Sequence, residues 1–245
     1  MDDTSKLIYG RNAVTEAIRS GAGVEKIMLQ KNIEGEGRKL FALAKKARIP
    51  VQVVPKSALD KEAEGAAHQG AAAIITNYSY SDIESILSAA MEKGEPPFIV
   101  ALDGIEDPGN LGAIIRSAEG AGVHGILIPK NRAASVTGIV MKASAGAAAH
   151  MKVAKVPGIK AAIDELKEKG IWIYGLDMDG KSFGDVDFGG GVCLVVGSEG
   201  QGMSRIVYES CDFLVSIPMK GRVGSLNASA AAAVVLFEVS SKWRK

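Results

Sequence analysis

The feature that most constrains the fold of this sequence is a regular alternation of apolar runs and helical patterns from Phe98 onward. The run 98–102 is wholly apolar, as is typical of a central strand buried on both faces of a parallel sheet. We therefore predict an α/β fold with a mostly parallel sheet and helices on both faces. The further strands expected are 125–128, one near Val153, 171–176, 193–196 and 213–217, and the expected helices are 110–121, 137–143, 159–169 and 227–243.

A smaller α/β/α unit is predicted over residues 1–77. Asn12 is a candidate N-cap for its first helix, because asparagine favours that position. Residues 78–97 read as a linker that holds a helix over 82–93 and a loop-like Gly94-Glu95-Pro96-Pro97 segment. The larger domain is then expected over 98–245. The other elements expected in the first unit are strands at 26–30, 51–54 and 71–76 and helices at 38–48 and 57–62.

Composition sets limits on the class of protein. The net charge is +1, so the strong basic excess of many nucleic-acid binders is absent, and any basic footprint must be local. No apolar run approaches the ~20 residues needed to span a bilayer, and no N-terminal leader pattern is present. Cys193 lies in an apolar run and reads as a buried thiol, which fits a reducing compartment. We expect a cytosolic protein.

Ligands of parallel α/β sheets bind beyond the carboxyl ends of the strands, and three loops there hold unusual residues. Loop one, 103–112, contains a Pro-Gly turn and Asn110, a good N-cap, and it leads into a helix that carries Arg116. By itself, this loop also fits a capped helix with a surface arginine.

Loops two and three are equally ambiguous when taken singly. Loop two, 197–202, has three glycines that would let the backbone approach a ligand closely, but its order is neither the dinucleotide fingerprint nor a P-loop. Loop three, 217–229, contains Ser225 and Asn227, either of which could cap the last helix. A tight turn and ordinary capping explain these loops without any ligand.

Together, the three loops resemble, in order, the three motifs of the SpoU family of RNA ribose 2′-O-methyltransferases, within the knotted SPOUT superfamily. The residues that carry the resemblance are Asp107-Pro108, Asn110, Arg116, Gly197-Ser198-Glu199-Gly200, Gly202, Ile217-Pro218-Met219 and Ser225-Leu226-Asn227-Ala228-Ser229. Tyr9-Gly10-Arg11-Asn12 and His68-Gln69-Gly70 look like the ribosomal-protein-like substrate-binding domain of one subgroup. That subgroup methylates a guanosine ribose in large-subunit (23S) rRNA.

The resemblance implies S-adenosylmethionine as the methyl donor, no metal, and a deep C-terminal trefoil knot. Because a guanidinium keeps its proton at neutral pH, we expect Arg116 to stabilise the developing oxyanion rather than to act as a base. The other catalytic residues it implies are Asn110, which would orient Arg116, and Glu199, Ser225 and Asn227. The residues expected to hold the donor are Leu176, Gly197, Glu199, Ile217, Met219 and Leu226.

The same resemblance implies an RNA partner and a homodimer whose sites are shared between subunits. The cations expected to contact RNA are Arg11, Lys130, Arg132, Lys142 and Arg222. Three alternatives stay open at this point. One is the same chemistry on tRNA or on an antibiotic-site rRNA nucleotide, and another is a non-catalytic RNA-binding assembly factor. The third, a nicotinamide-dependent oxidoreductase, is disfavoured by the glycine order of loop two.

Overall fold

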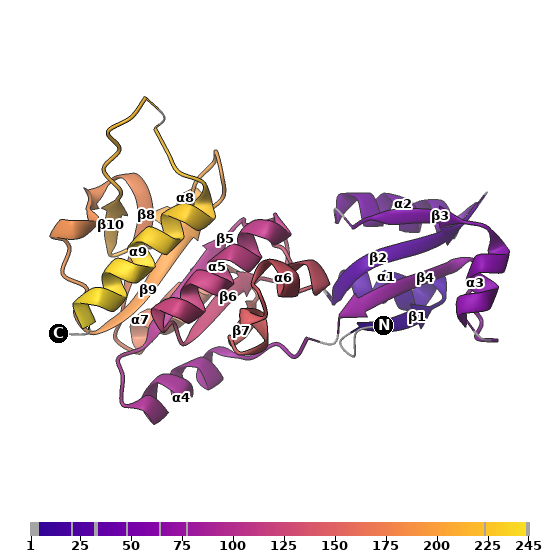
Figure 1. Ribbon diagram of the computed structural model, residues 1–245, viewed down its shortest axis with the longest axis horizontal. Helices are drawn as coiled ribbons and strands as arrows, with labels where there is room; N and C mark the ends of the chain where they lie inside the picture. Colours follow the sequence, from indigo (N-terminus) through magenta and orange to yellow (C-terminus); the bar gives the residue numbers. More distant parts are fainter. Residues whose placement is uncertain are drawn as a thin grey trace. The chain divides into compact units, whose positions relative to one another are not determined.

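The computed structural model describes residues 5–20, 22–31, 34–47, 49–63, 65–76, 78–222 and 224–243. Contacts within the chain define two compact units (Figure 1). The first comprises Met1–Ser79 with Ser135–Ile139, and the second comprises Tyr80–Ala134 with Val140–Lys245. Asn77, at the expected boundary, and Arg48, the expected end of a helix, lie outside the described residues. The division into 1–77, 78–97 and 98–245 stays a prediction.

The first unit is built on a four-stranded sheet in the order β1-β4-β2-β3. The strand β4 (Ala71–Thr76) pairs antiparallel with β1 (Ser5–Tyr9) and β2 (Gly23–Gln30), and β2 pairs parallel with β3 (Val51–Val54). Helices α1 (Arg11–Arg19) and α2 (Glu36–Lys46) pack on one face through Val14 and Leu40. Helix α3 (Lys56–Ala63) packs on the other face through Leu59. The predicted α/β/α unit is therefore confirmed.

Two details of this unit differ from the sequence predictions. The strand β1 was not predicted, because its stability comes from pairing with β4, which lies more than sixty positions away in the sequence. Asn12 is not the N-cap of α1: the helix begins at Arg11, after Gly10, whose φ of 96° favours glycine. The turn before the helix thus decides where it starts.

The second unit contains a six-stranded sheet in the order β10-β8-β9-β5-β6-β7, in which every adjacent pair is parallel. The central strands β5 (Phe98–Asp103) and β9 (Gly191–Gly197) are buried along nearly their whole length. The other strands are β6 (Gly125–Pro129), β7 (Val153–Val156), β8 (Ile171–Ser182) and β10 (Phe213–Ser216). The predicted parallel sheet is confirmed.

Helices cover both faces of this sheet (Figure 1). Odd-numbered residues of the central strands, such as Ile99 and Cys193, pack against α4 (Ile83–Lys93), α7 (Ile159–Glu168) and α8 (Arg205–Tyr208). Phe98 faces the other way and packs on Trp243, with the ring centroids 5.2 Å apart. Trp243 ends α9 (Ala228–Trp243), which packs beside α5 (Pro108–Ala121). The short α6 (Gly138–Ala143) follows β6.

Two further features of the second unit were not expected. The helix predicted over 82–93 is α4, but its Ile83 and Ile86 belong to the hydrophobic core of the second unit, which a linker does not imply. The strand β8 continues to Ser182 instead of ending at 176, and its pairing with β10 jumps from Gly175 to Lys181. None of the described helices is both long and apolar enough to cross a membrane. The C-terminal knot stays a prediction.

Candidate active site

Loop one is organised by an N-cap that the sequence analysis assigned to the wrong residue. Asp107, not Asn110, caps α5: its Oδ1 accepts a hydrogen bond from the backbone N–H of Asn110 over 2.7 Å, and Pro108 occupies the first helical turn. Because Asp107 caps the helix, the side chain of Asn110 is available for contacts with other loops.

The side chain of Asn110 joins loop one to the other two loops. Its Nδ2 donates to Oε1 of Glu199 over 2.9 Å, and its Oδ1 accepts from Nδ2 of Asn227 over 3.0 Å. Asn227 Nδ2 also donates to Oε1 of Glu199. The three expected residues therefore form one polar cluster, although they come from three separate segments of the chain.

Asn227 has a second task, which is to cap α9. Its Oδ1 accepts hydrogen bonds from the backbone N–H of Ser229 over 2.9 Å, from Oγ of Ser229 over 2.6 Å and from the N–H of Ala230 over 3.3 Å. Of the two candidate caps in loop three, the structure selects Asn227 over Ser225. The start of α9 is thus fixed to the same side chain that contacts loops one and two.

Loop two is a tight turn that only glycine permits at its first position. Ser198 and Gly202 exchange backbone hydrogen bonds of 3.0 and 2.9 Å. A Cβ on Gly197 would lie 2.2 Å from the carbonyl carbon of Gly202, so any side chain there would displace the turn. The segment that follows loop two is fixed to the end of β5, because Oδ2 of Asp103 accepts a hydrogen bond from the backbone N–H of Ser204 over 2.7 Å.

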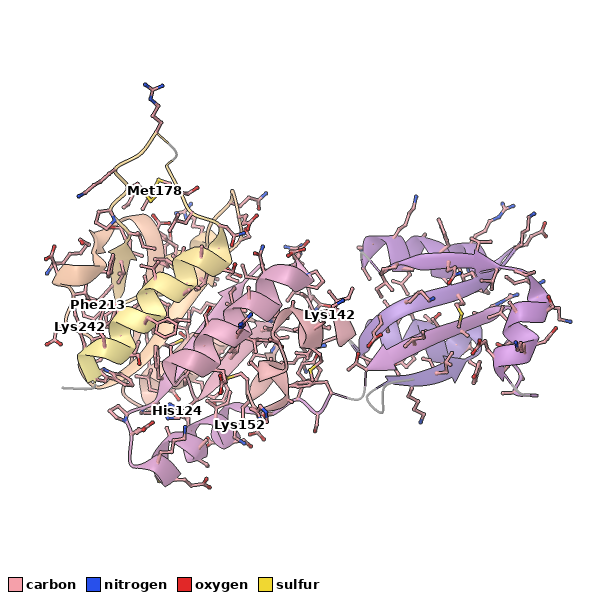
Figure 2. All side chains as sticks on the ribbon, in the orientation of Figure 1. His124, Lys142, Lys152, Met178, Phe213 and Lys242 are labelled. Atoms are coloured by element: carbon pink, nitrogen blue, oxygen red, sulfur yellow. The ribbon has the colours of Figure 1, made fainter. Side chains whose placement is uncertain are left out.

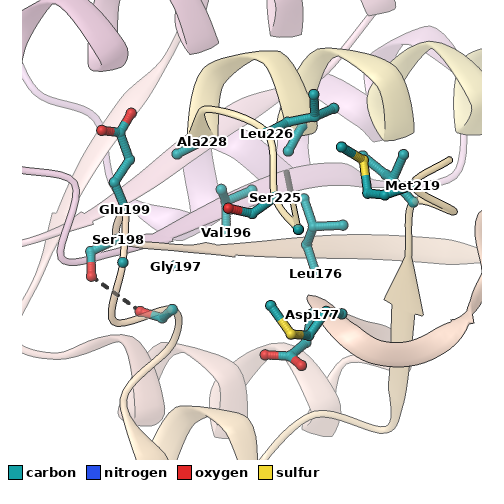
Figure 3. A pocket seen from close by; sticks show the side chains of 16 residues that line it. Leu176, Asp177, Val196, Gly197, Ser198, Glu199, Met219, Ser225, Leu226 and Ala228 are labelled. Carbon is teal, nitrogen blue, oxygen red and sulfur yellow. Dashed lines mark hydrogen bonds between the residues drawn. The ribbon is translucent and has the colours of Figure 1, made fainter. Parts of the chain in front are cut away.

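A pocket lies beside this cluster, next to residues 176–178 of β8 and at the carboxyl ends of β9 and β10 (Figure 3). All the residues expected to hold the donor line it, namely Leu176, Gly197, Glu199, Ile217, Met219 and Leu226, and Ser225 lines it as well. Sequence reasoning missed several lining residues, among them Asp177, Met178 and Ala231. Asp177 and Met178 follow the point where 171–176 was expected to end, and no local pattern marked them.

The chemistry of the pocket wall indicates what it can hold. Met219 and Leu226 are 38% and 39% exposed, so the wall offers bare aliphatic surface next to backbone N–H and C=O groups. Such a wall suits a flat heteroaromatic ring. The charged residues among its described lining, Asp177 and Glu199, are both carboxylates and suit a cationic group. An adenosyl sulfonium combines these two features, and the residues present therefore fit it.

Arg116 lies apart from this cluster. It is exposed on α5, does not line the pocket, and has no hydrogen-bond or ion-pair partner among the described residues. The amide of Asn110, which was expected to orient it, is bound to Glu199 and Asn227 instead. No side chain of the described part of the chain therefore holds the guanidinium of Arg116 in place.

The expected RNA-contacting cations are spread over both units. Lys130, Arg132, Lys142 and Arg222 are exposed in the second unit, and Arg11 is half-buried in the first. Arg11 Nε donates to the carbonyl oxygen of Gln69 over 2.7 Å, so the Tyr9–Asn12 and His68–Gly70 segments meet. These assignments stay predictions.

Two of the histidines have structural partners. His68 Nδ1 accepts from the N–H of Gly70 over 3.0 Å, so its Nε2 donates to Asp60. His124 is bound in the same way between the N–H of Phe98 and the carboxylate of Glu95, and burial lowers its pKa. Both rings fix loops of the fold rather than lining the pocket.

Comparisons with known proteins agree with this geometry. Residues 97–237 match the SpoU rRNA Methylase family, and residues 7–81 match the RNA 2′-O ribose methyltransferase substrate binding domain. The chain is 43% identical to YacO of Bacillus subtilis (strain 168), assigned to the TrmH family of tRNA/rRNA methyltransferases, over 99% of this chain and 98% of that protein. The SpoU methyltransferase AviRb from Streptomyces viridochromogenes, solved with AdoMet, is similar in structure, with a TM-score of 0.62 and 25% identity over 98% of this chain and 91% of that one.

Proposed function

This chain belongs to the SpoU rRNA methylase family, and from that premise we propose that it transfers a methyl group from S-adenosylmethionine to the 2′-hydroxyl of a guanosine ribose in 23S rRNA. The observation that carries the proposal is the convergence of Asn110, Glu199 and Asn227 beside an apolar pocket with a carboxylate-bearing wall. The reaction would take place in the cytoplasm.

Different residues of the pocket would bind different parts of the donor. S-adenosylmethionine supplies a methyl group on a positively charged sulfur, which is already a good leaving group. Leu176, Ile217 and Leu226 offer apolar contacts for the adenine, and the backbone of loop two can bond its polar edge. Holding both partners in line accounts for much of the rate that such an enzyme must supply.

The polar cluster orients the loops around the reacting hydroxyl. Glu199 Oε1 accepts from two amide groups, so its other oxygen is left to accept a hydrogen bond from a ligand. Ser225 lines the same wall and offers a hydroxyl. The guanidinium of Arg116 stabilises the charge that develops on the ribose oxygen as the hydroxyl proton leaves to solvent.

Arg116 does not line the pocket of its own chain, so we include in the proposal a homodimer in which a second copy of the chain would bring Arg116 to the pocket. Arg116 lies on α5, which packs beside α9, and Val234 and Phe237 on α9 are 39% and 49% exposed. A second copy that covers this apolar face would bury it and place Arg116 at the subunit boundary.

The RNA would be bound by the substrate-binding domain and by local cations. Arg11 lies at the meeting point of the two motifs in that domain, and Lys130, Arg132, Lys142 and Arg222 add positive charge near the strand ends. Because each phosphate contact releases counterions, binding should weaken as salt rises.

The test is to incubate the full chain with methyl-labelled donor and either ribosomal RNA or tRNA, and then to map the modified nucleotide. The proposal predicts label on the 2′-oxygen of one guanosine in 23S rRNA. Label on tRNA, or on another rRNA nucleotide, would show that the proposed target is wrong but that the proposed methyl transfer is right. Failure to bind the donor in calorimetry would indicate a non-catalytic RNA-binding protein and would refute the proposal.

A further inference from the structure

The strand β8 leaves the sheet for residues 176–180 and then returns. Leu214 of β10 pairs with Gly175, but the next residue, Val215, pairs with Lys181. The segment is anchored where it returns, because Ser216 Oγ donates to the carbonyl oxygen of Gly180 over 2.8 Å. Gly180 crosses β10 so closely that a Cβ there would lie 2.4 Å from the nitrogen of Val215. We call residues 176–180 the β8 excursion.

The β8 excursion places one carboxylate in the wall of the donor pocket. Asp177 is half-buried and lines the pocket (Figure 3). Its Oδ1 accepts from the N–H of Asp179 over 3.1 Å, which limits the rotation of the side chain. Its Oδ2 approaches loop two, 3.9 Å from where a Cβ on Gly202 would be. No cationic side chain of the described part of the chain forms an ion pair with Asp177.

The charged side chains among the described residues of the pocket wall are all negative. The described lining residues include two carboxylates, Asp177 and Glu199, and no lysine or arginine. Glu199 is engaged by the amides of Asn110 and Asn227, so Asp177 is the less engaged of the two. Met178, the neighbour of Asp177 in the β8 excursion, is labelled in Figure 2 and is exposed. A half-buried carboxylate interacts with a ligand's charge more strongly than it would in bulk water.

We propose that Asp177 is a specificity-determining residue: its carboxylate makes the pocket select the donor, whose sulfur is positively charged, over the product, whose sulfur is uncharged. This inference rests on the proposed function. In methyl transfer the carbon–sulfur bond breaks with its electron pair left on sulfur, a carbon–oxygen bond forms at the ribose, and the hydroxyl proton leaves to solvent. The sulfur thereby loses its charge, while the amino-acid end of the molecule stays the same. A carboxylate near the sulfur therefore attracts the donor and not the product, which favours product release.

The test compares ligands that differ in this one charge. Calorimetry on the full chain would measure Kd for S-adenosylmethionine, for S-adenosylhomocysteine, and for sinefungin, which carries an amine in place of the methylated sulfur. Asp177→Asn keeps the shape and the Oδ1 acceptor. We expect it to weaken the two charged ligands about tenfold and to leave S-adenosylhomocysteine unchanged, as expected for loss of one partly screened ion pair.

Asp179→Asn is the matched control, because it removes the same charge from the same excursion at an exposed position that does not line the pocket. It should leave the ratio of the Kd values unchanged. Equal loss of all three ligands in Asp177→Asn would assign the carboxylate to the amino-acid end or to folding, and would overturn the inference. So would an equal effect of Asp179→Asn. If the unaltered chain bound none of the three, the proposed function itself would fail.

Discussion

Asn227 donates a hydrogen bond from Nδ2 to Oδ1 of Asn110 over 3.0 Å, and so joins two residues 117 positions apart in the sequence. The same side chain caps α9 through its Oδ1. One residue thus couples the start of the last helix to the loop that begins α5. Stability and methyl transfer can be separated at this residue.

Asn227→Ala should remove both the cap of α9 and the hydrogen bond to Asn110. Loss of the cap should cost about 1 kcal/mol, which lowers Tm by about 2–4 °C in a chain of this size. Methyl transfer should fall by about tenfold or more, because loops one and three are no longer joined. Asn227→Ser is the informative control, since serine keeps a capping oxygen but has no amide donor. Its Tm should stay near that of the unaltered chain while its activity falls, and full activity would contradict the role of the cluster.

Arg116→Ala should affect the rate and not donor binding. In the role that we propose, the guanidinium would act on charge that exists only in the transition state, so kcat should fall by about 10²–10³ while Kd for the donor stays within about twofold. Single-turnover methylation and calorimetry would separate the two. Arg205→Ala removes another exposed cation, which is paired with Glu209, and should change neither quantity. A parallel loss of rate and donor affinity in Arg116→Ala would place the residue in the donor site instead.

Gly197→Ala should disturb loop two because the added methyl group overlaps the backbone of Gly202. The overlap must be relieved by a backbone shift, at a cost of about 1–3 kcal/mol, and donor affinity should fall with it. Gly184→Ala is the matched control, since a Cβ there would meet nothing within 4 Å. Thermal unfolding with and without the donor would report both effects. Unchanged donor affinity in Gly197→Ala would mean that the turn is not part of the donor site.

Stability should fall below neutral pH through His124. Burial lowers the pKa of this ring from its ordinary 6.5. As pH falls through about 6.5 the unfolded chain takes up a proton that the folded chain does not, so acid favours unfolding. Thermal unfolding at pH 7.5, 6.5 and 5.5 should show this loss. His124→Gln should flatten the profile in this window, whereas His150→Gln, which alters an exposed ring, should keep it. Equal profiles for the two variants would assign the effect elsewhere.

The sequence predicts those features that local pattern determines. The apolar run 98–102 is typical of a strand that is buried on both faces of a sheet, and it forms β5. The β8 excursion could not be predicted, because it depends on how β10 pairs with residues some forty positions earlier. Asn110 was assigned the cap because asparagine favours that position, yet Asp107 lies at the helix start with proline after it. Side-chain partners across loops become visible only once the sheet brings the loops together.

Phe237→Glu tests the proposed dimer. Phe237 is exposed on α9 and lies against Gly120 of α5, so a charge there would disrupt an apolar contact between two copies. Light scattering should show a dimer for the unaltered chain and a monomer for the variant. Activity should be lost with the dimer, because Arg116 would no longer reach a pocket. Met91→Glu places the same charge on α4, on the opposite face of the sheet, where Met91 is 76% exposed, and should leave both mass and activity unchanged. A fully active monomer would refute the shared site and would require Arg116 to act within its own chain.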